Sequence, residues 1–255
     1  MMHAPHPVFD ANPSTGADGL GNLPEWDLSD LYSGEDAPEL TRDLDWLERE
    51  CAAFASDYEG KLADLDATEL LKCIERNEKI SGIAGRIMSF AGLRYYQLTT
   101  DGGRTKFLSD CQEKINAFTT PLVFFTLELN RLEDDALAAM LAENDALARY
   151  KPVLDRIRAM KPHQLSDELE KFLHDLGVVG DACERLFDET IAGLTFEVDG
   201  ETRGLEATLN YLTEQDRSKR KAAAHELARV FGENIRIFSR VHNNGAKEKE
   251  VLDRR

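Results

Sequence analysis

Histidine and its neighbours decide whether this sequence can hold a catalytic metal ion. The chain has six histidines, and none is followed by a second histidine four residues later, the spacing that places two imidazoles on one face of a helix. The nearest approach is His225-Glu226-Leu-Ala-Arg229, which begins like the zinc-binding motif HExxH and ends with arginine. A guanidinium cannot bind Zn²⁺. We therefore expect a histidine beside a glutamate on a helix surface at this position.

Motifs for other kinds of chemistry are also missing. The sequence contains no GxxxxGK[ST] loop for nucleotide phosphates and no GxSxG serine elbow. Its four cysteines, at positions 51, 73, 111 and 183, show no CxxC spacing. Cys51 and Cys111 fall on apolar stripes, so we expect structural thiols rather than nucleophiles.

Composition limits the partners and the compartment. The 255 residues suffice for one large domain or two small ones, and 31 basic against 48 acidic residues give a net charge of −17. This charge disfavours nucleic acid as a partner. The longest uncharged apolar-rich run, Ile115–Leu127, is too short to cross a membrane and contains Pro121. No basic residue precedes Arg42, so no signal peptide is recognisable, and we expect a cytoplasmic protein that does not bind membranes.

The apolar spacing predicts a mainly α fold. One stripe steps by three and four residues from Leu40 to Tyr58, and a second runs from Leu108 to Leu129, where Pro121 should introduce a kink. Asp66 and Glu69 have capping-box spacing for a helix between these stripes, one that runs on or bends at Gly82 and Gly85. Both a bundle and a long coiled coil use such stripes. Because the second stripe soon stops, a multi-helix bundle is the better interpretation.

The second half continues as helix with one interruption. Alternating apolar and polar residues flank Asp199-Gly200, which predicts a small β-hairpin near 194–204. We expect three parts: a disordered arm at 1–22, a helical lobe at 23–192, and a hairpin with a long helix at 193–255. The helices expected outside the two stripes cover 133–143, 146–160, 166–176, 178–192, 205–212 and 214–238.

Several segments are more specific than their periodicity. In order along the chain they are Leu23–Tyr32, Thr120–Asn130, Lys161–Ser166, Arg185–Asp188 and Leu194–Gly200. Together they resemble the N-terminal part of the oligoendopeptidase F family, zinc metallopeptidases related to thimet oligopeptidase. The resemblance runs from about Leu23 to the last residue, less than half of the family's usual length.

The resemblance implies a helical lobe that forms one wall of a deep channel, which limits substrates to oligopeptides by size. It further implies that the other lobe supplies the zinc, through two histidines and a downstream glutamate, with the glutamate of HExxH as general base. The present sequence ends on an uncapped helix before that region. We therefore expect a truncated fragment that binds no zinc and does not hydrolyse peptides alone.

Two alternatives to a fragment remain open. The chain could be a free-standing helical interaction module, or a peptide-binding domain that does not cleave. In either case an apolar surface normally covered by the catalytic lobe would be exposed, which makes self-association or pairing with a separate catalytic portion plausible. Basic residues outnumber acidic ones from Arg217 to Arg255, and this excess fits an interface with such a catalytic portion.

Three residues are candidates for contact with peptide, and no catalytic or metal-binding residue is assigned. The polar tips of Tyr95, Tyr96 and His163 could bond a peptide backbone from an otherwise apolar wall. The competing interpretation is packing for the tyrosines and local capping for His163. Adjacent residues point to different faces of a helix, so one tyrosine should be buried and the other exposed.

Overall fold

A computed structural model describes residues 26–180 and 182–254, and the expected arm at 1–22 lies outside them. The described residues form a mainly α protein with one small hairpin, as the sequence predicts. The elements are α1 (Pro38–Tyr58), η2 (Leu62–Asp64), α2 (Ala67–Gln97), α3 (Gly102–Thr119), η3 (Thr120–Leu122), α4 (Val123–Arg131), α5 (Asp134–Glu143), α6 (Asp145–Ala148), α7 (Lys151–Arg158), η4 (Lys161–His163), α8 (Asp167–Gly180), α9 (Ala182–Ala192), β1 (Phe196–Val198), β2 (Glu201–Arg203), α10 (Leu205–Asn210), η5 (Tyr211–Thr213), α11 (Arg217–Glu233) and α12 (Ile235–Asp253).

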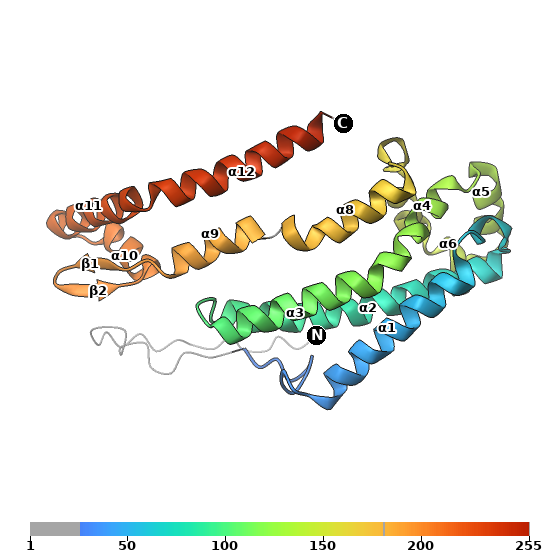
Figure 1. Ribbon diagram of the computed structural model, residues 1–255, viewed down its shortest axis with the longest axis horizontal. Coiled ribbons are helices and arrows are strands. Elements are labelled where there is room, and N and C mark those ends of the chain that lie inside the picture. The colour runs from blue at the N-terminus through green and yellow to red at the C-terminus, as the bar shows by residue number, and fades with distance from the viewer. Residues whose placement is uncertain (1–25, 181, 255) are drawn as a thin grey trace, which may run out of the picture.

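The helices lie in two elongated layers (Figure 1). In the first layer α1, α2 and α3 pack against one another along their lengths, and α4 to α7 gather at one end of them. In the second layer α8 packs against α3 and α4, and α9 continues in the same direction. The hairpin, α10 and α11 lie beyond α9, and α12 runs back along it.

The main core lies in the first layer and follows the predicted stripes. Leu40, Leu47, Cys51 and Phe54 of α1 are buried against α2, α3 and α4. The ring of Phe54 lies 5.9 Å from that of Phe124 and 5.7 Å from that of another α4 phenylalanine, Phe125. These stripes therefore serve a bundle, as expected.

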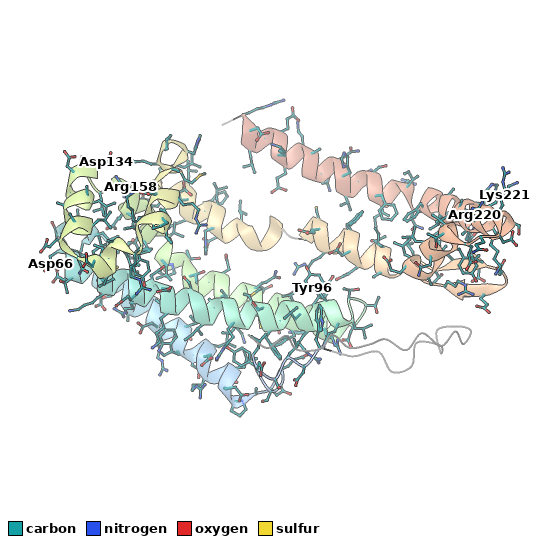
Figure 2. All side chains as sticks on the ribbon, turned by 180° about the vertical axis from the view of Figure 1, so that it is seen from behind. Asp66, Tyr96, Asp134, Arg158, Arg220 and Lys221 are labelled. Atoms are coloured by element: carbon teal, nitrogen blue, oxygen red, sulfur yellow. The ribbon has the colours of Figure 1, made fainter. Side chains whose placement is uncertain are left out.

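The long helix α2 spans the first layer, and its start is capped as predicted. The Asp66 carboxylate accepts from Thr68 N and Glu69 N, both at 2.8 Å, and Glu69 accepts in return from Asp66 N at 3.1 Å. The helix passes through Gly82 and Gly85 without a break. Asp66 and Tyr96 mark its two ends in Figure 2.

Three expected helices are interrupted. At Pro121 the chain forms the 3₁₀ turn η3, which separates α3 from α4 where a kink was expected. The expected 146–160 helix divides into α6 and α7, because Pro152 lacks an N–H and disfavours helix just before itself. The expected 214–238 helix ends at Asn234, whose side chain donates to Val230 O at 2.9 Å and competes with the backbone.

The predicted hairpin is confirmed. Asp199 and Gly200 have φ angles of 56° and 79°, the left-handed pair that a mirror-type two-residue turn requires. The strands pair with Phe196 opposite Arg203 and Val198 opposite Glu201. Phe196 packs with Leu227 and other apolar residues of α11, forming a second, smaller core.

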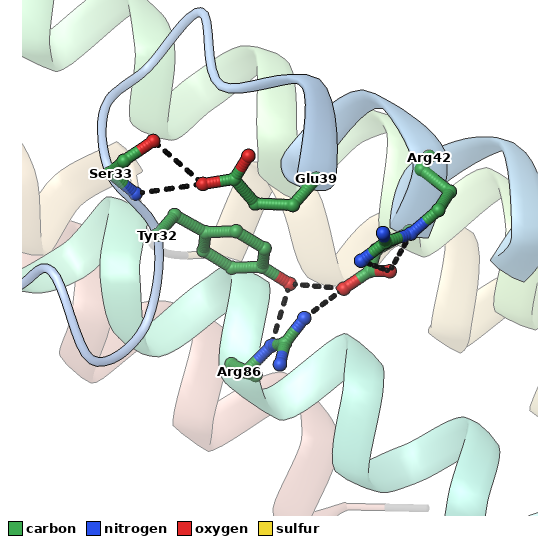
Figure 3. A network of polar contacts seen from close by, with 6 residues as sticks. Tyr32, Ser33, Glu39, Arg42 and Arg86 are labelled. Atoms are coloured by element: carbon green, nitrogen blue, oxygen red, sulfur yellow. Dashed lines mark hydrogen bonds and ion pairs between the residues drawn. The ribbon is translucent and has the colours of Figure 1, made fainter.

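One buried acid fastens the segment before α1 to the first layer (Figure 3). Asp43 is 7% exposed, and it accepts from Tyr32 Oη at 3.0 Å and pairs with Arg86 of α2. Arg86 Nε donates to Tyr32 Oη at 2.9 Å, and its guanidinium lies 4.6 Å from the tyrosine ring centre. The network thus joins this segment, α1 and α2 around one carboxylate.

None of the helices in 26–180 and 182–254 is long and apolar enough to cross a bilayer.

Replacing Arg86 with methionine should destabilise the protein by about 2 kcal/mol, because Asp43 would stay buried without its main cation. The value lies below the roughly 3–5 kcal/mol of fully buried pairs, since the Arg86 side chain is 39% exposed. Guanidinium denaturation followed by circular dichroism measures this difference. Arg42 also pairs with Asp43 but is 71% exposed, so Arg42→Met should cost at most about 1 kcal/mol. Equal losses in both variants would contradict this account.

Candidate functional site

A hollow of about 450 Å³ lies where α4, α7, η4 and α8 meet. We call it the Asn130 hollow. Its wall contains parts of two of the segments singled out in the sequence, the end of Thr120–Asn130 and the middle of Lys161–Ser166. The lining residues are Thr126, Leu127, Asn130, Ile157, Met160, His163, Gln164, Leu165, Glu170 and Leu173.

A second hollow, of about 690 Å³, adjoins the first. Thr126, Glu170 and Leu173 line both, and Asn77 to Ala84 of α2 form the far wall of the second. Together the two hollows make a groove bounded by α4 and α8. A groove of this kind, with an apolar floor and a few polar groups, is typical of a ligand site.

The position of α4 is fixed by Arg158, the last residue of α7. The final carbonyls of a helix have no partner within it, and Arg158 donates to two carbonyls at this end, Leu129 O and, at 2.7 Å, Leu132 O. The same guanidinium pairs with Asp134 at the start of α5. Asn130 lies between the two carbonyls in sequence and is held with them.

The opposite wall, α8, is attached by polar contacts at both ends of the groove. Arg131 of α4 pairs with Asp167 at the start of α8. Further along, Thr120 Oγ1 donates to Asp175 at 2.7 Å, and His174 Nε2 lies 3.2 Å from Thr119 Oγ1. Hydrogen bonding to Arg131 lowers the pKa of Asp167, so this carboxylate remains charged and paired at neutral pH.

Asn130 is the unusual member of the site. It is 5% exposed, and its Oδ1 has no hydrogen-bond partner among the described residues. A buried polar atom without a partner costs about 1–3 kcal/mol, so folding alone does not explain an amide here. Asn130 lines the hollow, so a rotation of its side chain would let a donor there satisfy this oxygen.

The three predicted contact residues are not brought together. His163 lines the Asn130 hollow and is exposed. Tyr95 is 1% exposed, whereas Tyr96 is 61% exposed, which is the division of roles expected of neighbours on a helix. Both lie more than ten residues beyond Ala84, the last α2 residue of the groove, or about 16 Å along the helix, and Figure 2 shows Tyr96 far from Arg158 and Asp134.

Three of the four cysteines are buried, as expected of structural thiols. Cys51, Cys73 and Cys111 are buried, and Cys183 is partly exposed. Burial raises the pKa of Cys51 and of Cys111 to about 11, and that of Cys73 to about 12. These three thiols stay protonated at neutral pH, so they are poor nucleophiles.

The segment that begins like HExxH supports the hairpin. Glu226 accepts from Glu197 N of β1 at 2.9 Å, and Arg229 donates to both oxygens of Glu226, at 2.6 and 2.8 Å. Arg229 also donates to Glu233 at 2.7 Å. The Glu226 carboxylate therefore already accepts hydrogen bonds from two residues, and this arrangement does not fit a zinc site. Among the described residues, no three His, Cys, Asp or Glu side chains gather closely enough to hold a metal ion.

The sequence prediction missed Asn130 and chose His163. A signal was present, since Phe124, Leu127 and Asn130 step by three and make a buried row on α4. A polar residue at the end of such a row is rare. Its lack of an internal partner, however, depends on Arg158 and on the placement of α8, which are distant in sequence.

Comparison with known proteins gives sequence matches of two kinds. A model of the Oligopeptidase F family matches residues 128–196, which include Asn130, His163 and Glu170. Oligopeptidase PepF of Bacillus subtilis (strain 168) is 24% identical over 218 residues, which are 82% of this chain and 32% of that protein. Group B oligopeptidase PepB of Streptococcus agalactiae is 22% identical over 245 residues, 90% of this chain and 39% of that protein.

The fold is shared with a solved structure. Oligoendopeptidase-F from Enterococcus faecium matches with a TM-score of 0.73 and 23% identity, over 82% of this chain and 42% of that one. The chain spans about a third of the length of the curated relatives it matches. The resemblance to the N-terminal part of the oligoendopeptidase F family is confirmed.

Acid should weaken the attachment of the hairpin. Glu226 of α11 accepts hydrogen bonds from Arg229 and from Glu197 N of the hairpin, and these bonds lower the pKa of Glu226 from 4.5 to about 2. A lowered folded-state pKa stabilises the protein above pH 4.5, and this contribution is lost as the pH falls toward 2. Glu226→Gln should therefore lower the Tm at pH 7, and the difference from the unsubstituted protein should shrink below pH 5. A difference that stays constant from pH 7 to pH 3 would contradict this assignment.

Asn130→Leu should leave stability unchanged or increase it, because it removes a buried acceptor that has no partner. Thr208 is the matched control, since it is also buried but donates to Gly204 O at 2.8 Å. Thr208→Val should cost about 1 kcal/mol. Urea denaturation of both variants measures the contrast, and a loss above about 2 kcal/mol for Asn130→Leu would show that the amide supports the fold.

Proposed function

We propose that this chain is the channel-wall lobe of a zinc-dependent oligoendopeptidase that hydrolyses short peptides. The observation that carries the proposal is the groove itself. Two segments that resemble the family in sequence, Thr120–Asn130 and Lys161–Ser166, lie 30 or more residues apart and line one hollow. The names of the curated relatives, oligopeptidases, support peptide as the ligand.

The chemistry of the groove suits a short extended peptide. Apolar side chains on its floor can take alternate side chains of the ligand, while the amide of Asn130 and the imidazole of His163 can bond its backbone. Tyr95 is assigned to packing, because 1% exposure leaves no surface for contact. Tyr96 is exposed but lies outside both hollows.

Hydrolysis is assigned to residues beyond these 255. The sequence shown holds no HExxH, and the one similar segment is used by the hairpin. We propose that the zinc, which activates the attacking water in the family, is held by a catalytic portion that pairs with this lobe. On this proposal the chain of 255 residues binds peptides in the cytoplasm but does not cleave them alone.

The purified 255-residue chain should bind unstructured peptides of five to ten residues and leave them intact. Calorimetry measures the binding, and mass spectrometry after incubation with Zn²⁺ detects cleavage. Leu127→Glu, which places a charge on the floor of the Asn130 hollow, should weaken binding at least about tenfold, with the exposed site Glu168→Lys as control. Peptide cleavage that a chelator abolishes would overturn the proposal that this chain does not hydrolyse peptides alone. Failure to bind any of the peptides would overturn the proposed role of the groove.

The second candidate function is a helical interaction module, favoured by one observation. Apolar side chains on one face of α8 are 38–57% exposed, namely Leu169, Phe172, Leu173 and Leu176. Residues spaced by three and four are neighbours on a helix surface, so these make a continuous patch. Concentration-dependent self-association of the purified chain, together with no affinity for peptides, would favour this function over the first.

A further inference from the structure

We infer that the Asn130 hollow selects a positively charged group of the bound peptide, an ammonium or a guanidinium, beside an apolar residue. This inference rests on the proposed function, because it assigns a specificity to the same groove. It is carried by the unpartnered acceptor of Asn130 and by the kinds of side chain that surround it.

The hollow has donors in the amides of Asn130 and Gln164 and in the imidazole of His163, but Glu170 gives it an acceptor that carries a full negative charge. Asn130 Oδ1 is buried and has no partner. Glu170 supplies a carboxylate, of which Oε1 accepts from Leu165 N at 2.8 Å. The Thr126 hydroxyl donates weakly to Val123 O, at 3.5 Å, which leaves its lone pairs for a donor. Oriented acceptors beside a carboxylate favour a ligand with several N–H donors.

Two arginines beside the hollow, Arg158 and Arg131, are already paired. Neither lysine nor arginine lines it, and His163 is the one lining residue of the described chain that can carry a positive charge. Arg158 is bound to the carbonyls at the end of α4 and to Asp134, and Arg131 is bound to Asp167. A cationic ligand therefore meets an unneutralised Glu170, whereas the carboxylate end of a peptide would be repelled by it.

The apolar lining suits the rest of such a ligand. Leu127 and Ile157 lie on the floor, and the exposed side chains of Met160 and Leu165 lie at the rim. A lysine or arginine buries its aliphatic stem along apolar surface and carries its charge to a polar end. Methionine adapts to stems of different shape. The hollow thus offers both parts of a basic side chain a matching surface.

Calorimetry with matched peptides tests the inference on the 255-residue chain. The reference is Ala-Leu-Lys-Leu-Ala, acetylated and amidated, and its partners carry norleucine, arginine or glutamate in place of lysine. The lysine and arginine peptides should bind about tenfold more tightly than the norleucine peptide, and the glutamate peptide most weakly. A norleucine peptide with a free amino end separates recognition of a terminal amine from that of a side chain.

Two substitutions link the preference to the hollow. Glu170→Gln removes the charge and keeps an oxygen for Leu165 N, and Asn130→Leu removes the acceptor. Each should reduce the preference for lysine over norleucine to about twofold or less. Glu168→Gln makes the same charge change two residues away on α8, about half a turn around the helix and outside the hollow, and should keep the preference.

The outcomes separate this inference from the proposed function. Equal affinity for the lysine and norleucine peptides, or a preference that survives both substitutions, overturns the inference and leaves peptide binding intact. Failure of all the peptides to bind overturns both. If Asn130→Leu does not fold, Glu170→Gln decides alone, since it keeps the hydrogen bond made by the original side chain.

Discussion

The buried end of α4 sets the strongest requirement in this structure. A helix of nine residues has nearly as many unpaired backbone groups as paired ones, and α4 lies between the first layer and α8. Arg158 supplies donors to its final carbonyls and holds the start of α5 through Asp134. Without that guanidinium the carbonyls would be buried without donors, and the wall of the Asn130 hollow would lose its position.

The second layer depends on this arrangement more than on its own core. Several apolar side chains of α8 and α9 remain exposed, and α12 has no buried residue. Polar pairs attach the layer at separate points, among them Arg131 with Asp167 and Arg185 with Gln112 at 2.7 Å. A surface of this kind is typical of one built to meet another protein surface. The exposed apolar surface of α8 and α9 is consistent with the finding that this chain spans about a third of the length of its curated relatives.

One of the many acidic residues, Glu170, places its charge in the groove. The net charge of −17 is mostly spread over solvated helix faces, where single carboxylates have little effect. In the hollow, Glu170 lies beside the buried acceptor of Asn130, and the nearest arginines are occupied elsewhere. The same charge therefore acts more strongly there, because less water screens it.

Local spacing by itself determined the helices with regular stripes, the capping box at Asp66 and the turn at Asp199-Gly200, because each depends on neighbours within about one turn of helix or hairpin. It also argued against a zinc site at His225, since the residue four positions on is arginine. The breaks at Pro152 and Asn234 depart from the expected helices, although their causes are local. Only the tertiary structure decided the site. Asn130 matters because Arg158 and α8, far from it in sequence, close a hollow around an acceptor that no side chain of the described chain satisfies.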